Sequence, residues 1–237
     1  MAILARERLI VALDLPTVSE AERLVERLGE AVYFYKVGLE LFCGGGYFEL
    51  VDRLLGRGKK VFADLKFYDI PATVGRAVRN LSRTGVQFCT VHGDRKILEA
   101  AAENKGPLKV LAVTVLTSLD GRALREMGYD KDLQTLVLER AKLAKEAGVD
   151  GVIASAKEAA AIRETVGDGF LIVTPGIRPS GSAAGDQRRI ATPKAAISAG
   201  SDYLVVGRPI RDAPDPKRAA LAIQEEIADA FRERGKR

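Results

Sequence analysis

The chain has 237 residues, of which 47% are hydrophobic and 29% are charged, and its formal net charge is +5. Two isolated cysteines and ordinary glycine and proline contents exclude a disulfide-rich scaffold, a collagen-like chain and a low-complexity chain. No apolar run approaches the ~18–20 residues of a membrane span, and the first residues lack a signal-peptide pattern. We therefore expect a soluble, cytoplasmic protein with no membrane or nucleic-acid partner, since its basic residues are scattered among acidic ones.

Short apolar runs alternate with longer amphipathic runs along the whole chain. The first four strand–helix pairs are predicted at 9–14 and 18–28, 32–38 and 47–55, 60–66 and 71–83, and 88–92 and 95–103. The other four are predicted at 109–115 and 133–147, 151–154 and 156–165, 170–174 and 193–199, and 203–206 and 215–232. A polar insertion at 117–131 and a Gly-, Ser- and Pro-rich loop after 174 separate some of these elements.

Eight such units predict an α/β fold, namely a (β/α)8 TIM barrel that forms a single domain over residues 1–237. An open doubly wound sheet is the alternative, because the sequence does not show whether the sheet closes. In a barrel, functional residues lie at the C-terminal ends of the strands. Ionisable side chains gather at these predicted ends: Asp14, Lys36, Asp64, Lys66, Asp69, His92, Arg178 and Arg208.

Two of these side chains share one predicted strand. Because strand side chains alternate with a period of two, Asp64 and Lys66 are expected on the same face, pointing into the barrel mouth near Lys36 and Asp14. Burial of such a cluster is costly unless its charges pair. By spacing alone, the cluster is either a salt-bridge network that stabilises the barrel or part of an active site.

The loops after strands seven and eight bind phosphate in many barrels. Here they contain Arg178, Gln187 and the pair Gly207-Arg208. Glycine lets backbone N–H groups approach an anion, and arginine supplies a two-pronged donor. Either arginine alone is as easily a surface charge, but together they predict a phosphate site. The segment 178–189 is expected to be a mobile lid, because its small residues cannot pack a core.

The single histidine, His92, excludes a zinc site built from several histidines. No GxSxG, GxxxxGK[ST] or strand-linked GxGxxG pattern is present. We expect His92 to be a hydrogen-bonded structural residue, although an acid–base role at neutral pH stays open.

Eight sequence motifs occur in order from about residue 9 to 230: ALDLP (12–16), KVGLELF (36–42), DLKFYDIPATV (64–74), TVHG (90–93), VLTS (115–118), TPGIRP (174–179), DQRR (186–189) and VVGRPI (205–210). In these motifs the chain resembles the orotidine 5′-monophosphate decarboxylase family, most closely its bacterial branch. The resemblance implies decarboxylation of orotidine 5′-monophosphate to UMP, the last step of pyrimidine nucleotide synthesis, with no metal and no organic cofactor.

The resemblance also implies a role for individual residues. The catalytic array would consist of Lys36, Asp64, Lys66 and Asp69, with Lys66 stabilising and then protonating the carbanion at C6. Asp14 and Lys36 would bind ribose, and Thr117 and Ser118 the pyrimidine. Gln187, Gly207 and Arg208 would bind phosphate beside Arg178. The further expected substrate contacts are Asp64, Ile70, Pro71, Thr73 and Pro175.

By the same resemblance, Asp69 and Thr73 would reach the site of the other subunit, which implies a homodimer. Two alternatives of other kinds remain at this stage. One is a Mg²⁺-dependent sugar-phosphate decarboxylase or aldolase of the same barrel superfamily. The other is a non-catalytic barrel that binds a nucleotide through its phosphate.

Overall fold

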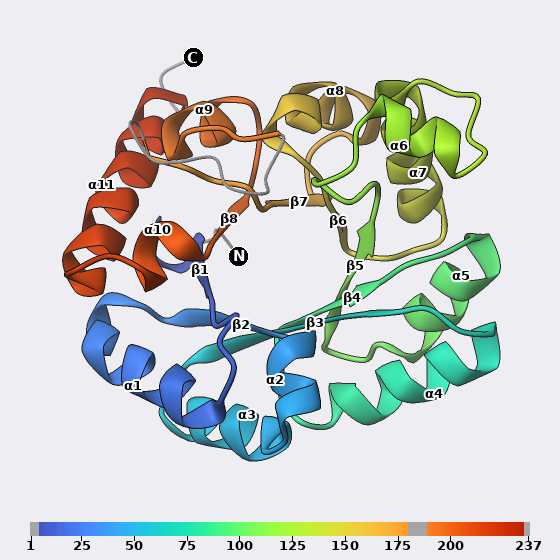
Figure 1. The fold of residues 1–237 in the computed structure, drawn as a ribbon. Helices are drawn as coiled ribbons and strands as arrows, with labels where there is room; N and C mark the ends of the chain where they lie inside the picture. The colour runs from blue at the N-terminus through green and yellow to red at the C-terminus, as the bar shows by residue number, and fades with distance from the viewer. Residues whose placement is uncertain (1–4, 180–188, 235–237) are drawn as a thin grey trace.

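The computed structural model describes residues 5–179 and 189–234. Its eight strands are parallel and close into a barrel in chain order, because β1 pairs with both β2 and β8 (Figure 1). The strands are β1 (Leu9–Ala12), β2 (Phe34–Gly38), β3 (Lys60–Phe67), β4 (Phe88–Val91), β5 (Lys109–Val113), β6 (Gly151–Ile153), β7 (Leu171–Thr174) and β8 (Tyr203–Val206). The predicted (β/α)8 barrel is confirmed, and the open sheet is excluded.

Helices form a ring around the strands (Figure 1). They are α1 (Val18–Leu28), α2 (Leu39–Gly44), α3 (Tyr47–Gly56), α4 (Pro71–Ser82), α5 (Arg95–Asn104), α6 (Gly121–Glu126), α7 (Leu133–Glu146), α8 (Ala156–Val166), α9 (Pro193–Ser198), α10 (Arg208–Arg211) and α11 (Pro216–Arg234), with 3-10 turns η1 (Ala5–Glu7) and η2 (Gly29–Ala31). Side-chain oxygens of Thr17, Asp94 and Asp132 accept backbone N–H bonds and so begin α1, α5 and α7. In the described part of the chain, no helix is both long and apolar enough to cross a membrane.

The strands are buried on both faces, as their continuous apolar sequences predict. One set of side chains packs against the helices. The other set fills the barrel, where the Phe88 ring lies 5.0 Å from that of Phe34 and 5.1 Å from that of Tyr203, centroid to centroid. This inner layer forms an apolar floor for the mouth of the barrel.

The predicted elements differ from the observed ones mainly at their ends and at three short helices. The strands expected at 9–14 and 109–115 are shorter in the structure, where regular strand pairing ends at Ala12 and Val113. Single backbone hydrogen bonds continue past these ends, from Leu13 N to the carbonyl oxygen of Lys36 and from Thr114 N to that of Ile153. Helices α2, α6 and α10 have at most six residues each and are absent from the predicted elements, because each lies in a segment that connects a predicted strand to its predicted longer helix.

Strand β3 carries an irregularity that matters for the site. Its register with β4 pairs Ala63 with Cys89 and then Phe67 with Val91, so that residues 64–66 lie opposite the single residue Thr90. This is a β-bulge, which re-aims side chains locally. Within it, Lys66 adopts a φ of 48°, the left-handed region that non-glycine residues rarely occupy.

Candidate active site

A pocket of about 440 Å³ opens at the C-terminal ends of the strands. Its apolar floor comes from the inner layer of the barrel, at Phe62, Ile153 and Val205. Its polar lining, with Pro175 and Gly207 beside it, comes from segments that are far apart in the sequence: Asp14, Lys36, Asp64, Lys66, Thr117, Ser118, Pro175, Arg178, Gly207, Arg208 and Arg211. Ten of these eleven are predicted site residues, since Arg211 alone is new, and the closed barrel therefore brings most of the expected site together.

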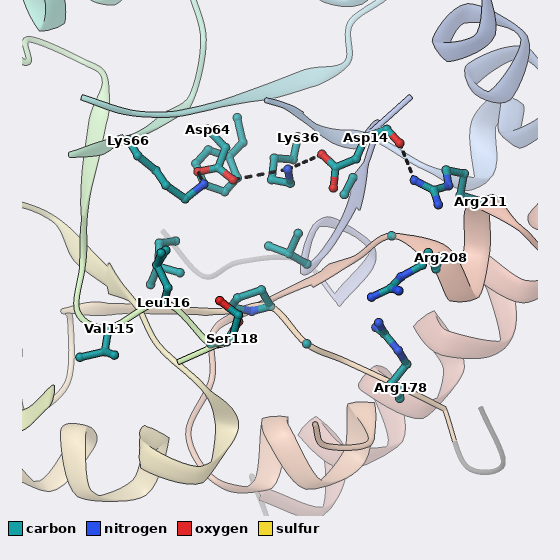
Figure 2. Close-up of a pocket in the computed structure, with 18 residues that line it drawn as sticks. Asp14, Lys36, Asp64, Lys66, Val115, Leu116, Ser118, Arg178, Arg208 and Arg211 are labelled. Carbon is teal, nitrogen blue, oxygen red and sulfur yellow. Dashed lines mark hydrogen bonds and ion pairs between the residues drawn. The ribbon is translucent and has the colours of Figure 1, made fainter. Parts of the chain in front are cut away.

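Four charged side chains alternate in sign along one wall of the pocket (Figure 2). Lys66 Nζ lies 2.9 Å from Asp64 Oδ1. Lys36 Nζ lies 3.4 Å from Asp64 Oδ2 and 2.6 Å from Asp14 Oδ1. Each ammonium group therefore faces at least one carboxylate, which is the pairing that burial of such charges requires.

Burial and charge act against each other in this row. Burial alone would raise the pKa of Asp64, but Lys36 and Lys66, with hydrogen bonds from Lys66 and Thr90, outweigh it and hold this pKa below its ordinary value. Burial would likewise lower the pKa of Lys36, but Asp64 and Asp14 outweigh it and raise that pKa. Both groups are therefore charged at neutral pH. The Lys66 side chain is 32% exposed, which leaves it open toward the pocket.

Arginines come from two loops at the other end of the pocket. Figure 2 shows Arg178 and Arg208 directed toward each other, away from Lys66. Arg178 follows β7 and is buried, whereas Arg208 begins α10 directly after Gly207. Arg211, one turn further along α10, donates a hydrogen bond to the backbone carbonyl of Asp14. Positive charge here is suited to an anion such as phosphate.

The third wall is the segment 115–118 after β5. Thr117 is buried, and Ser118 lines the pocket near its centre (Figure 2). Arg189 holds this wall from behind, because its Nη2 donates to the carbonyl oxygens of Val115 and Leu116 at 3.2 and 3.1 Å. Arg189 is itself paired with buried Glu158 at 2.8 Å.

Four of the predicted residues lie outside this pocket. Asp69, Ile70, Pro71 and Thr73 belong to the β3–α4 connection and the start of α4, on the outer surface of the same end of the barrel. Asp69 Oδ1 accepts the backbone N–H of Ile70 at 2.6 Å, and Ile70 is 65% exposed. Gln187, the remaining predicted residue, and most of the expected lid at 178–189 lie outside the described residues.

Three contributors were not predicted from the sequence. Thr90 is completely buried and hydrogen-bonds both Asp64 and Lys66. The signal for it was a polar residue inside an apolar strand run. Arg211 was signalled by its position three residues after Arg208, on the same side of a helical turn. Nothing in the local sequence marks Arg189 as the partner of Glu158, because the two are 31 residues apart.

His92 stands beside the site without lining it. Its ring packs edge-on against that of Tyr68 at 5.8 Å. Burial, followed by the nearby charges of Arg140 and Lys66, lowers the pKa of His92 below 6.5, so the ring is neutral at pH 7. Among the described residues, no group of three or more His, Cys, Asp or Glu side chains is placed to hold a metal ion.

Comparison with known proteins places this geometry in context. The model of the orotidine 5′-phosphate decarboxylase / HUMPS family matches residues 7–223. Orotidine 5′-phosphate decarboxylase of Methylococcus capsulatus is 57% identical over 95% of this chain and 93% of its own. That of Rhodopseudomonas palustris strain BisA53 is 54% identical over 95% and 97%. The crystal structure of the Lactobacillus acidophilus enzyme is 40% identical, with a TM-score of 0.83 over 93% of this chain and 99% of its own.

Proposed function

The chain belongs to the orotidine 5′-phosphate decarboxylase / HUMPS family, and we propose that its pocket removes CO₂ from orotidine 5′-monophosphate to give UMP. The observation that supports this most strongly is that the two ends of the pocket carry different charged groups. Lys66 and Asp64 lie at one end, and Arg178 and Arg208 lie at the other (Figure 2). A nucleotide whose phosphate occupies the arginine end would bring its base toward Lys66.

The chemical step is the loss of a carboxylate from C6 of the pyrimidine. The C6–carboxylate bond breaks, CO₂ leaves, and the electron pair stays on C6, where the ring delocalises it poorly. A fixed ammonium group beside C6 stabilises this charge as it develops. Lys66 Nζ then gives a proton to C6, which makes UMP, and the resulting amine regains a proton from water.

Asp64 supports this step through its charge. Its two oxygens already accept from Lys66, Lys36 and Thr90, so the carboxylate is held in one orientation. It would fix the ammonium group of Lys66 at C6 and lie near the departing carboxylate. A group fixed before the reaction needs no reorganisation in the transition state.

The other predicted site residues would bind the remaining parts of the substrate. Arg178, Arg208, Gly207 and Gln187 would hold the phosphate, and Asp14 with Lys36 would bind the ribose hydroxyls. Thr117 and Ser118 would meet the edge of the pyrimidine, beside Pro175. Binding energy from the phosphate, remote from C6, can then be used to hold the base against Lys66.

Asp69, Ile70, Pro71 and Thr73 would complete the site of a second subunit in a homodimer. The exposed apolar side chains of Tyr68 (71%) and Ile70 (65%) flank Asp69 and support an interface at this place. In a twofold dimer each subunit gives the same patch to the other, so both sites are completed at once. The cytoplasmic location and the absence of a nucleic-acid partner stay predictions.

The test follows the loss of orotate absorbance when the purified protein meets orotidine 5′-monophosphate in excess EDTA. We expect rapid turnover by the wild-type protein and its collapse in Lys66→Ala, with the circular dichroism of the two proteins alike. Activity that needs Mg²⁺ and a pentulose or hexulose phosphate would contradict the proposal. Tight nucleotide binding by a folded dimer without turnover would also contradict it.

A further inference from the structure

The β-bulge in β3 replaces a backbone hydrogen bond with a side-chain one. Three residues of β3, 64–66, lie opposite Thr90 of β4, so the regular ladder is interrupted there. The backbone N–H of Lys66 donates to Thr90 Oγ1 at 2.9 Å instead. Thr90 therefore satisfies a donor that the bulge would otherwise leave without a partner inside the protein.

The same hydroxyl also contacts the neighbouring carboxylate. Thr90 Oγ1 lies 2.9 Å from Asp64 Oδ1, and since it already accepts from Lys66 N, its own hydrogen is directed to Asp64. Asp64 Oδ1 in turn accepts from Lys66 Nζ at 2.9 Å. The three groups close a ring that joins the backbone of Lys66 to the end of its own side chain.

This ring holds an unfavourable backbone conformation. Lys66 has a φ of 48°, which is costly for a residue with a Cβ and persists only where the surroundings impose it. In a regular strand the backbone of Lys66 would be extended, and its ammonium group would start from a different place. Thr90 is completely buried on β4, which is paired with β3 on one side and β5 on the other, so its hydroxyl is fixed by packing.

We propose that Thr90 is a positioning residue for the decarboxylation: its hydroxyl holds the backbone of Lys66 in the left-handed conformation and fixes the Asp64 carboxylate, so that Lys66 Nζ is directed at the reacting carbon. This inference rests on the proposed function. Thr90 does not line the pocket and acts only through Lys66 and Asp64. Its loss should therefore affect the chemical step more than substrate binding, which depends mostly on groups at the other end of the pocket.

Two substitutions distinguish the role of the Thr90 hydroxyl from that of the side-chain volume. Thr90→Val keeps the shape of the side chain and removes the hydroxyl, whereas Thr90→Ser keeps the hydroxyl and removes a buried methyl group. If Thr90 is a positioning residue, Thr90→Val lowers kcat by about 10- to 100-fold while KM changes by less than about threefold. Thr90→Ser should keep kcat within about threefold of wild type, because it keeps both hydrogen bonds, although the small cavity that it leaves lowers its Tm slightly.

The signature of the proposal is a loss of kcat in the variant without the hydroxyl and a retained kcat in the variant that keeps it. Equal kcat values for Thr90→Val and Thr90→Ser would overturn it, as would a loss in Thr90→Val that appears only in KM. If Thr90→Val does not fold, Thr90→Ala, which lacks the hydroxyl and adds no bulk, takes its place. The same comparison of kcat with KM then applies against Thr90→Ser.

Crystal structures of the variants test the inference without any assay. We expect Lys66 to leave the left-handed region in Thr90→Val and to keep it in Thr90→Ser, with Lys66 Nζ displaced from Asp64 only in the former. An unchanged Lys66 in Thr90→Val would overturn the inference even if the wild-type protein is active. Absence of wild-type turnover, together with the expected shift of Lys66, would instead count against the proposed function alone.

Discussion

At the scale of single residues, the site depends on charges that are stable only together. Asp64 has a side chain that is 13% exposed, and that of Lys36 is 11% exposed. Either ion alone at this depth would be strongly unfavourable, and removal of one leaves the other uncompensated. The alternation Lys66, Asp64, Lys36, Asp14 thus provides one buried ammonium group, that of Lys36, and one that is open toward the pocket, that of Lys66, beside a substrate that is itself an anion.

The lowered pKa of Asp64 predicts a specific dependence of stability on pH. Because the folded protein holds this carboxylate ionised more strongly than the unfolded chain does, its contribution to stability is present above pH 3.8 and is lost as the pH falls further through the folded value. Asp64→Asn lacks this contribution. The difference in free energy of unfolding between wild type and Asp64→Asn should therefore shrink on acidification below pH 3.8, as measured by urea titration.

The exposed Asp52 of α3 gives a control for the loss of one negative charge. Asp52→Asn is expected to leave the free energy of unfolding at neutral pH close to that of wild type. A difference between wild type and Asp64→Asn that stays constant through acid pH would mean that Asp64 is not held by Lys36 and Lys66.

His92 gives a second prediction at this scale. Burial, Arg140 and Lys66 lower its pKa, so it carries no charge at neutral pH and supplies no proton in our mechanism. His92→Asn should therefore leave the pH profile of kcat/KM with the same limbs as wild type, measured from pH 5 to 9 with one substrate. A limb present in the wild type and missing in His92→Asn would assign the acid–base role to His92 instead of Lys66.

At the scale of elements, the pocket walls are held from outside by buried polar contacts. Arg189 joins the segment 115–118 to α8 through Glu158, and the side chains of the pair are only 8% and 6% exposed. Arg189 Nε and Glu158 Oε2 are buried with no hydrogen-bond partner, so the pair already carries an unfavourable contribution. We therefore infer that the Arg189–Glu158 pair mainly positions the segment 115–118 and adds little to the stability of the fold.

Removal of one partner tests this arrangement. Arg189→Ala leaves Glu158 buried without its cation, and we expect the free energy of unfolding to fall by about 3–5 kcal/mol. Arg122→Ala is the matched control, because Arg122 and Glu126 form an ion pair on α6 whose side chains are 83% and 64% exposed. Chemical denaturation should show that the free energy of unfolding of Arg122→Ala is nearly that of wild type. A similar fall in the free energy of unfolding of both variants would mean that the buried ion pair contributes no more to stability than the exposed one.

At the scale of the whole molecule, closure of the barrel gathers one site from the two ends of the chain. Asp14 follows the first strand and Arg208 the last, yet both line the same pocket, because β1 and β8 are neighbours. The residues of the segment 68–73 do not line this pocket, and Tyr68, Asp69 and Ile70 are exposed. A second copy of the chain is the occupant that we propose for this surface.

Mixed dimers test the contribution of Asp69 to the partner site. Lys66→Ala and Asp69→Ala should each be almost inactive. In an equal mixture refolded together, half of the dimers are mixed, and each mixed dimer has one site with an intact Lys66 and an intact Asp69 from the other subunit. Activity should return to about a quarter of wild type. If Asp69 acts within its own subunit, no site in the mixture is complete and no activity returns.

Much of the fold and of the site follows from local sequence. The continuous apolar runs in strands such as 9–12 reflect burial of both faces, and the longer period in helices such as 18–28 reflects burial of one face; each segment encodes its pattern by itself. The rule that parallel strands place their C-terminal ends together then groups Asp14, Lys36, Asp64, Lys66 and Arg208 without knowledge of any contact.

Tertiary structure alone decided the features that depend on contacts between distant segments. Whether the sheet closes is determined by the pairing of β1 with β8, and local periodicity is the same in open and closed sheets. The bulge in β3, the left-handed Lys66 and the two hydrogen bonds of Thr90 arise from the register between strands 24 residues apart. The sign of each pKa shift depends on the balance of burial against opposite charges through space. The sequence by itself therefore determined most of the residues that line the pocket, and the folded chain determined how each is held and charged and which further residues hold them.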